Sequence, residues 1–315
     1  MSKILVSVII PCRNEEKYIG RCLDSIIGQD YPKEKLEVLV MDGMSEDRTR
    51  EIIKNFQFSN SDFQIKLIDN PQKFTPFGLN IGIKNSKGEV IIRMDSHAAY
   101  QKDYISKCLS YLEKYKADNV GGIIKTIPAE DTLIARAIAV CLSHFFGVGN
   151  SYFRTGSKKP KWVDTVFGGC YRKEVFDKMG LFNENLIRSQ DMEFNLRLKR
   201  KGGKILLAPD IVSYYYPKSK LGEFFIHNFK DGFWGVFPLK FVKMPLSWRH
   251  YIPLFFVLTL PISIWPYLLI NLYFSSKVAI KEKEFGFLFA LPIVFAVRHF
   301  GYGLGSLWGL IKLIL

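Results

Sequence analysis

The chain has 315 residues, of which 48% are hydrophobic and 15% aromatic, and its formal net charge is +14 at pH 7. This length suits one large α/β domain with an appendage, or two domains. The positive charge fits nucleic acid or an anionic membrane surface, but no nucleic-acid-binding module is recognisable, so we expect no nucleic-acid partner. Five scattered cysteines without a CxxC pair argue against a disulfide framework or zinc knuckle and fit a reducing compartment.

The first 100 residues alternate short apolar runs with amphipathic stretches. Apolar residues between positions 19 and 27 recur at helical spacing. Strand, helix, strand in repetition predicts parallel strands with right-handed crossovers, and ligands of such sheets bind at the carboxyl ends of the strands. The predicted strands are residues 4–10, 37–41, 65–68 and 90–94.

Polar loops follow three of these strands: "PCRNEE", "DGMSED" and "DSHAAY". In the second loop Ser45 and the two acids after it are typical of a helix start, so we assign Glu46 no catalytic role. In the third loop a divalent ion beside Asp95 would supply the positive charge that a bound diphosphate needs. His97 is a suitable second ligand, because neutral imidazole binds transition ions. The alternative is a histidine packed against Tyr100 at a strand end.

Several common chemistries are not supported by motifs. No GxGxxG follows the first strand and no GxxxxGK[ST] occurs, which argues against a dinucleotide Rossmann site and a P-loop NTPase. HExxH and GxSxG are also absent, which argues against zinc proteases of that type and the common serine hydrolases. The remaining prediction is a nucleotide-binding sheet without phosphate-cradling glycines.

The middle of the chain predicts a strand at 122–127 and a helix at 131–146. Gly168 and Gly169 mark a close approach of backbone. A helix is predicted from Ser189 to Lys201, ended by two glycines. Asp191 lies in its first turn, a position that complementarity to the helix dipole also explains.

The last quarter of the chain is strongly apolar. Residues 252–274 form 23 consecutive uncharged residues, and about 20 are needed to cross a bilayer core. Their three prolines are better tolerated in a membrane bundle than in a soluble helix. A second apolar block, 285–315, is interrupted by Arg298 and His299, which either are buried at a protein contact or lie in the interface. Residues 217–250, basic and aromatic, read as an interfacial belt facing anionic headgroups.

Four segments together resemble a known family. They are "VSVIIPCRNEEKYIGRCLDSIIGQDYP", "LEVLVMDGMSEDRTREII", "NPQKFTPFGLNIGIKNSKGEVIIRMDSHAAYQKDYI" and "FGGCYRKEVFDKMGLFNENLIRSQDMEFNLRLKRKGGKI". In this order they resemble the inverting glycosyltransferases of family 2, which have the nucleotide-sugar-binding GT-A fold. The chain is most similar to the membrane-attached branch typified by succinoglycan-synthesis glucosyltransferases. In that branch the Asp-x-Asp element reads Asp-x-His, and the tail resembles "RHFGYGLGSLWGL" here.

The resemblance implies an α/β fold class: a GT-A domain with a Rossmann-like mixed sheet, followed by an interfacial segment and C-terminal transmembrane helices. The expected boundaries are 1–216 for the catalytic domain, 217–250 for the interfacial amphipathic segment and 251–315 for a membrane region of about two helices. The number of crossings stays open.

The resemblance also implies which residues bind the donor. Asp42 would hydrogen-bond the base, typically uracil, and Asp95 would lie at the ribose and diphosphate. Asp95 and His97 would bind a divalent cation, Mn²⁺ or Mg²⁺, and the imidazole favours Mn²⁺. The nucleotide-sugar-binding residues are Pro11, Arg13, Asn14, Glu15, Asp42, Gly43, Asp95 and Ser96.

Asp191 aligns with the aspartate that the family uses as general base. The residue before it is often acidic in the family and is Gln190 here, so a single carboxylate is expected. The family often carries Gln/Arg-x-x-Arg-Trp after the last strand, and "HNFKDGFW" meets this motif only in part, so processive polymerisation is not expected. The residues expected at the acceptor or donor-sugar pocket are Gly168, Gly169, Gln190, His227, Lys230 and Trp234.

The predicted function is that of an inverting, metal-dependent hexosyltransferase. It would move a hexose from a nucleotide sugar, with a UDP-sugar expected, to a hydroxyl of a lipid-linked glycan in polysaccharide or glycoconjugate biosynthesis. Its other partners would be membrane lipids, and it would be an integral protein of the cell membrane with the catalytic domain facing the cytoplasm. Two alternatives stay open: a polyprenyl-phosphate acceptor, as in dolichyl-phosphate mannose synthases, and a non-catalytic nucleotide-sugar-binding scaffold.

Overall fold

The computed structural model describes residues 4–60 and 63–315, and the chain divides into two compact units. The first comprises Met1–Ile124 and Gly156–Tyr215, and the second comprises Lys125–Thr155 and Tyr216–Leu315. The expected catalytic domain, residues 1–216, is therefore interrupted. Residues 125–155 belong to the second unit because their apolar helix α5 (Leu133–Ser143) packs against the long C-terminal helix α14 (Phe287–Ile314).

The first unit is built on a mixed sheet, which in the described residues has nine strands in the order β3-β2-β1-β4-β8-β6-β9-β5, with β7 paired to β9. The strands predicted for the first 100 residues are confirmed and run parallel. They are β1 (Val6–Cys12), β2 (Leu36–Asp42), β3 (Gln64–Asp69) and β4 (Val90–Arg93). Cys12 pairs with Asp42, and Asp42 with Asp69, so these strands end level with one another.

The sheet becomes mixed at β8, which runs antiparallel to β4. The predicted strand at 122–127 is confirmed as part of β6. The remaining strands are β5 (Ala98–Tyr100), β6 (Asn119–Thr126), β7 (Lys161–Trp162), β8 (Cys170–Arg172) and β9 (Ile205–Tyr215).

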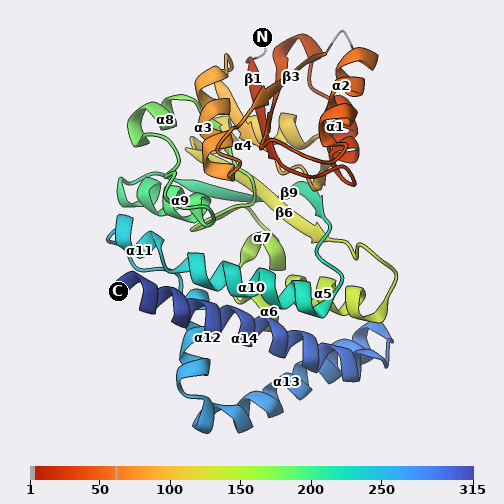
Figure 1. Ribbon diagram of the computed structural model, residues 1–315, viewed down its shortest axis with the longest axis vertical. Helices are drawn as coiled ribbons and strands as arrows, with labels where there is room; N and C mark the ends of the chain where they lie inside the picture. Colours follow the sequence, from red (N-terminus) through yellow and green to blue (C-terminus); the bar gives the residue numbers. More distant parts are fainter. Residues whose placement is uncertain (1–3, 61–62) are drawn as a thin grey trace. The chain divides into compact units, whose positions relative to one another are not determined.

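Helices cover both faces of the parallel strands, which explains why those strands are apolar on both sides. Val8 of β1 shares a core cluster with Leu23 of helix α1 (Ile19–Ile27). Ile9, on the opposite face, meets α3 (Thr75–Asn85), where a Cβ added at Gly82 would lie 2.5 Å from Ile9. In Figure 1, α1 and α3 lie on opposite sides of β1.

The other helices of the first unit pack around these. The short helix η1 contacts β2, α2 contacts β3, α4 contacts β8 and β9, and α8 contacts β8. Their bounds are η1 (Lys33–Lys35), α2 (Thr49–Ser59), α4 (Tyr104–Tyr115), α8 (Glu174–Met179) and α9 (Gln190–Arg200). The helix predicted at 189–201 is thereby confirmed as α9.

The second unit is helical and is organised around α14, which contacts α5, α6, α10, α12 and α13. Three glycines of α14 at intervals of four face α10. A Cβ added at Gly305 would lie 2.1 Å from the Phe229 carbonyl oxygen, and one at Gly309 would lie 2.5 Å from that of Phe233. The glycines therefore let two helix backbones touch. The remaining helices are α6 (Phe145–Val148), α7 (Tyr152–Thr155), α10 (Leu221–Gly235), α11 (Pro238–Phe241), α12 (Trp248–Leu258) and α13 (Leu260–Glu282).

Arg298 and His299 are engaged in protein contacts within this unit, one of the two alternatives left by the sequence. Arg298 donates through Nε to the Gly147 carbonyl oxygen at 3.2 Å and through Nη1 to the side chain of Asn228. His299 Nε2 lies 2.8 Å from the Phe146 carbonyl oxygen, and Nδ1 lies 3.0 Å from the Tyr267 hydroxyl. The pair therefore holds α6 and α10 against α14.

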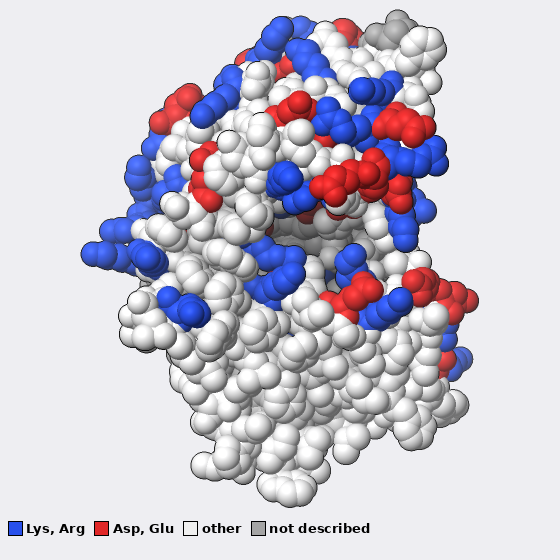
Figure 2. Space-filling model, viewed as in Figure 1, with Lys and Arg blue, Asp and Glu red and all other residues white. Residues whose placement is uncertain are grey.

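Among the described residues, α14 is the one helix whose length and composition would let it cross a membrane by itself. Helices α12 and α13 qualify only as a pair, and they are bent by 118° at the break between them. The uncharged stretch 252–274 thus lies on two helices, because α12 ends at Leu258 and α13 begins at Leu260, with Pro261 in its first turn. The face over α12 and α13 carries almost no charged side chains in Figure 2.

Candidate active site

The loops after β1 and β2 are hydrogen-bonded to one another at the carboxyl edge of the sheet. Asn14, with φ of 54°, donates its N–H to Ser45 Oγ at 2.9 Å and accepts at Oδ1 from the Glu46 N–H at 2.9 Å. Glu15 donates its N–H to Thr49 Oγ1 at 2.7 Å. Helix α2 therefore begins at Thr49 and not at Ser45, whose hydroxyl serves the loop contacts instead. This corrects the helix start expected from the sequence.

Two further predicted residues of these loops, Arg13 and Gly43, lie together. Arg13 Nη2 is 3.8 Å from Glu46 Oε1, and both side chains are exposed. A Cβ added at Gly43 would lie 2.9 Å from the Lys73 carbonyl oxygen and 3.1 Å from Arg13 Cβ. Pro11 is the second-last residue of β1, within the same edge. The predicted nucleoside-binding residues are therefore neighbours.

Asp42, at the end of β2, is fully buried and has protein partners on both carboxylate oxygens. Oδ1 accepts from Ser45 Oγ at 2.5 Å, and Oδ2 accepts from Arg50 Nη1 at 2.6 Å. Arg50 also donates to Asp69 Oδ1 at 2.9 Å. Hydrogen bonds to Asp42 and Asp69 raise the pKa of Arg50, so this guanidinium stays charged. Arg50 is absent from the predicted residues, although two aspartates ending adjacent strands indicate a shared cation.

Asp95, two residues beyond the end of β4, has its main chain held by Tyr100. The Asp95 N–H donates to the Tyr100 hydroxyl at 2.6 Å. Burial, and then the charge of Asp95, raise the pKa of Tyr100 well above its ordinary value. The hydroxyl therefore stays protonated. Ser96 beside it is buried.

His97 lies in the same loop and turns toward the first strand. Its Nδ1 is 3.2 Å from Glu15 Oε1, and its ring meets Tyr215 edge-on at 5.5 Å between centroids. His97 therefore contacts an acidic residue of the loop after β1 and an aromatic residue of β9. In the described part of the chain, no three or more His, Cys, Asp or Glu side chains are grouped as a metal centre.

Arg93, the last residue of β4, joins the two carboxylates predicted for donor and base. Nη2 lies 3.1 Å from Asp95 Oδ1, and Nη1 lies 3.4 Å from Asp191 Oδ2. The Arg93 side chain is 11% exposed, against 16% for Asp95 and 38% for Asp191. Burial lowers the pKa of Arg93, but the charges of Asp95 and Asp191 outweigh it and hold the pKa above its ordinary value. A permanent cation therefore separates the two carboxylates.

Arg93 was not predicted as a site residue. The signal for it is the charge at the end of the otherwise apolar run "VIIR". Residues 93 and 95 also point to the same side of an extended chain, so a salt bridge between them is sterically easy.

Asp191 stands in the first turn of α9, after Ser189 with φ of 60°. Its Oδ1 accepts from the Met192 N–H at 2.9 Å. Gln190 is buried beside it. The helix is fixed by Asn195, which donates to Thr165 Oγ1 at 3.0 Å and accepts from Asn119 Nδ2 at 3.0 Å. The candidate base is therefore presented by a rigid element.

The close backbone approach predicted at Gly168 and Gly169 is confirmed, and the partner is Arg93. The Arg93 N–H donates to the Gly169 carbonyl oxygen at 2.9 Å. Gly168 has φ of 67°, and a Cβ there would lie 2.6 Å from the Arg93 carbonyl oxygen. Only glycine readily adopts this positive φ and has no Cβ to collide with the carbonyl oxygen.

The three remaining predicted residues, His227, Lys230 and Trp234, belong to the second unit and lie along α10. Their spacing places them on one face of that helix. His227 Nε2 is 3.2 Å from Asp231 Oδ2, one turn further on.

Arg50 allows a stability test of this edge. Replacing it in Arg50→Met leaves Asp42 buried without a counter-ion, and we expect the free energy of unfolding to fall by about 3 kcal/mol. Asp69→Asn removes the second carboxylate bound by Arg50. Asp69 is 56% exposed, so the free energy of unfolding should fall by less than about 1 kcal/mol. Denaturant unfolding in detergent, followed by fluorescence, measures both. Equal small losses would show that Asp42 does not depend on Arg50.

Sequences similar to this chain belong to known glycosyltransferases. The model of the family Glycosyl transferase family 2 matches residues 7–180. The dolichyl N-acetyl-α-D-glucosaminyl phosphate 3-β-D-2,3-diacetamido-2,3-dideoxy-β-D-glucuronosyltransferase of Methanococcus voltae is 31% identical, over 98% of this chain and 97% of that protein. The succinoglycan biosynthesis protein ExoA of Rhizobium meliloti is 26% identical, over 71% of this chain and 67% of that protein.

The fold has a solved counterpart. The mannosyltransferase PcManGT from Pyrobaculum calidifontis, solved in complex with GDP-Man and Mn²⁺, superposes with a TM-score of 0.65 at 18% identity, over 98% of this chain and 88% of that one. The GT-A fold expected from the sequence is thereby confirmed. The family model and the Methanococcus relative together show that this chain belongs to glycosyl transferase family 2.

Proposed function

We propose that this glycosyltransferase moves a hexose, with inversion, from a nucleotide sugar to a hydroxyl of a lipid-linked glycan, in polysaccharide or glycoconjugate biosynthesis. The observation that carries the proposal is the position of Arg93 between Asp95 and Asp191. Asp95 is the donor-side carboxylate and Asp191 the base. The Arg93 guanidinium therefore fixes the position of the proposed donor-side carboxylate relative to the proposed base, and all three residues belong to the first unit.

The chemistry is a single in-line displacement. Asp191 accepts the proton of the acceptor hydroxyl while that oxygen forms a bond to the anomeric carbon. The bond from this carbon to the diphosphate oxygen breaks, and its electron pair leaves with the nucleoside diphosphate. One displacement inverts the anomeric configuration. The 38% exposure of Asp191 leaves it accessible to an acceptor, while the salt bridge to Arg93 orients the carboxylate.

The side chains proposed to lie beside the leaving group offer suitable ligand atoms for a divalent cation. Asp95 offers a carboxylate and His97 an imidazole, a set that suits Mn²⁺ or Mg²⁺ when substrate phosphates complete the coordination. Glu15, 3.2 Å from His97 Nδ1, would orient the imidazole, as carboxylates that hydrogen-bond a ligating histidine commonly do. When bound, the ion would offset the charge that grows on the leaving diphosphate.

The acceptor class is supported by two findings. The Methanococcus relative is named for a substrate in which a sugar is joined to dolichyl phosphate. Helix α14 has the length and composition to cross a membrane, where such lipids reside. We therefore propose an integral protein of the cell membrane whose first unit faces the cytoplasm, where sugar nucleotides are available. UDP is the proposed donor nucleotide, bound by the loop of residues 11–15 and Asp42.

The direct test is a transfer assay with membranes that contain the protein. Radiolabelled UDP-glucose, UDP-galactose, UDP-N-acetylglucosamine and GDP-mannose are each supplied with a lipid-linked glycan extract, and label in the organic phase is counted. We expect transfer from a UDP-sugar, with inverted configuration in the product. Transfer from GDP-mannose alone would contradict the proposed nucleotide, and binding without transfer from any donor would indicate a scaffold.

Asp191→Asn tests the base. We expect kcat to fall by about 10²- to 10⁴-fold, the usual contribution of general base catalysis, with little change in the KM for the donor. Asp177→Asn, an exposed carboxylate on α8, is the matched control and should leave kcat unchanged. A loss of only a few fold in Asp191→Asn would indicate an acceptor that is already ionised, such as a polyprenyl phosphate.

Metal dependence is tested at His97. A chelator should abolish transfer, and Mn²⁺ should restore more activity than Mg²⁺. In His97→Asp we expect the preference to shift toward Mg²⁺, because a carboxylate replaces an imidazole. The ratio of the two restored rates is the measurement. Transfer that survives chelation would refute the ligand role of His97.

A further inference from the structure

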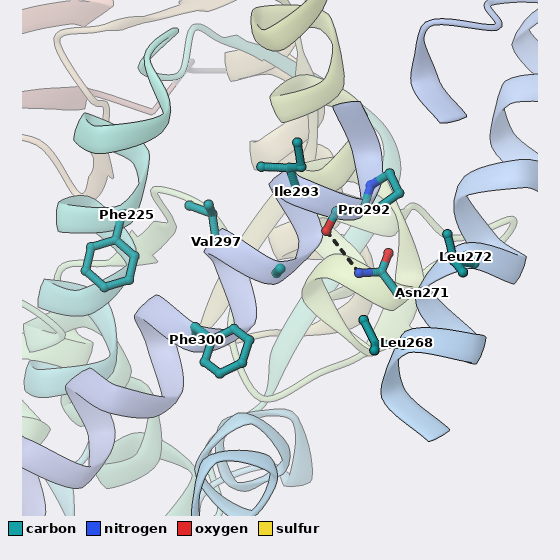
Figure 3. A pocket seen from close by; sticks show the side chains of 9 residues that line it. Phe225, Leu268, Asn271, Leu272, Pro292, Ile293, Val297 and Phe300 are labelled. Carbon is teal, nitrogen blue, oxygen red and sulfur yellow. Dashed lines mark hydrogen bonds between the residues drawn. The ribbon is translucent and has the colours of Figure 1, made fainter. Parts of the chain in front are cut away.

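An apolar pocket lies between helices α10, α13 and α14 of the second unit (Figure 3). Its volume is about 500 Å³. The lining side chains come from all three helices and are almost all hydrocarbon. They are Phe225, Leu268, Asn271, Leu272, Pro292, Ile293, Ala296, Val297 and Phe300.

The single polar side chain among these nine has its hydrogen bonds inside the protein. Asn271 Nδ2 donates to the Pro292 carbonyl oxygen at 3.0 Å and to the Tyr267 hydroxyl at 3.3 Å. Its Oδ1 accepts from Ser275 Oγ at 3.2 Å. The pocket therefore offers a ligand hydrocarbon contact and no polar group, which excludes a nucleotide or a sugar as occupant.

The pocket walls are fixed by contacts that cross between helices. The bond from Asn271 to Pro292, drawn in Figure 3, ties α13 to α14. On the α10 side, a Cβ added at Gly301 would lie 3.2 Å from the Phe225 carbonyl oxygen, so α10 and α14 are in close contact. Helices held in this way do not readily collapse into the void, and apolar cavities of this kind bind apolar ligands.

Part of the lining is open to the exterior. Ile293 and Leu272 are each 52% exposed, and Leu268 is 40% exposed. These residues stand on the helices that qualify, alone or as a bent pair, as membrane spans. A hydrocarbon chain in a bilayer would therefore reach the pocket laterally.

A cation lies one helical turn from a lining residue and favours a lipid that carries phosphate, because Arg298 hydrogen-bonds Asn228, three residues after Phe225. Val297 precedes Arg298, whose guanidinium contacts the neutral acceptors Gly147 and Asn228 and the Tyr302 ring. No carboxylate of the described residues forms a salt bridge with Arg298. A cation on a membrane helix that lacks an acidic partner is suited to an anionic ligand.

We propose that this pocket binds the polyprenyl chain of the phosphate-linked acceptor and so selects acceptors by their lipid. The inference rests on the proposed function, because it takes the acceptor to be lipid-linked. It adds a second recognition site, separate from Asp191 and the donor residues. Hydrocarbon buried there lowers the KM for the acceptor without changing the chemical step.

The test compares one glycan phosphate on two lipids, a long polyprenyl chain and a short water-soluble alkyl chain. Ala296→Trp fills the pocket from α14. We expect its KM for the long-chain acceptor to rise by about tenfold or more, as when burial of about two methylene groups is lost. The KM for the short-chain acceptor and for the donor should stay unchanged. Leu268→Trp, from the opposite wall, should give the same pattern if Ala296→Trp folds poorly.

Ile262→Trp is the matched control, since Ile262 is 82% exposed on α13 and lies outside the lining. It should leave both KM values unchanged. If the wild-type protein uses the long-chain acceptor but neither pocket variant raises the KM for it, the pocket does not bind the acceptor chain and the inference is wrong. If the wild-type protein transfers sugar to neither acceptor, the proposed function fails, and the inference with it.

Discussion

The salt bridges of Arg93 to Asp95 and Asp191 are the interaction on which the candidate site depends. The charges of Asp95 and Asp191 hold the pKa of Arg93 above its ordinary value, so a permanent cation lies between the two carboxylates. The backbone of the same residue meets Gly168 and Gly169, so the floor of the predicted sugar site is fixed to the same point. The proposed donor carboxylate, the proposed base and the two glycines are therefore all in contact with one residue at the end of one strand.

Much of this edge could be predicted because its residues directly follow apolar strands. Parallel pairing brings the carboxyl ends of β1, β2 and β4 together, so the loops at Asn14, Asp42 and Asp95 had to be neighbours. The cations could not be predicted in the same way. Arg50 and Arg93 find partners on other strands or on α9, and such pairings depend on register and on helix placement that no local pattern encodes.

In the second unit too, the contacts of the C-terminal motif could not be predicted from its sequence alone. The sequence identified "RHFGYGLGSLWGL" as unusual, and the charged pair was expected at a protein contact or in the interface. Its glycines are explained only by the neighbouring backbone of α10, and Arg298 and His299 only by the carbonyl groups of α6. Helix α5 was assigned to the catalytic domain because an apolar helix does not reveal which core it joins. In the structure it packs on α14.

The central claim is that Arg93 acts through Asp191 and not only through the fold. A double-mutant cycle measures this directly, with kcat/KM for transfer determined for Arg93→Met, Asp191→Asn and the double variant. The account predicts strong non-additivity: Arg93→Met should cost at least about tenfold in the wild-type background and little once Asp191 is already replaced. Additive losses in the double variant would contradict it and would reduce Arg93 to a structural residue of β4.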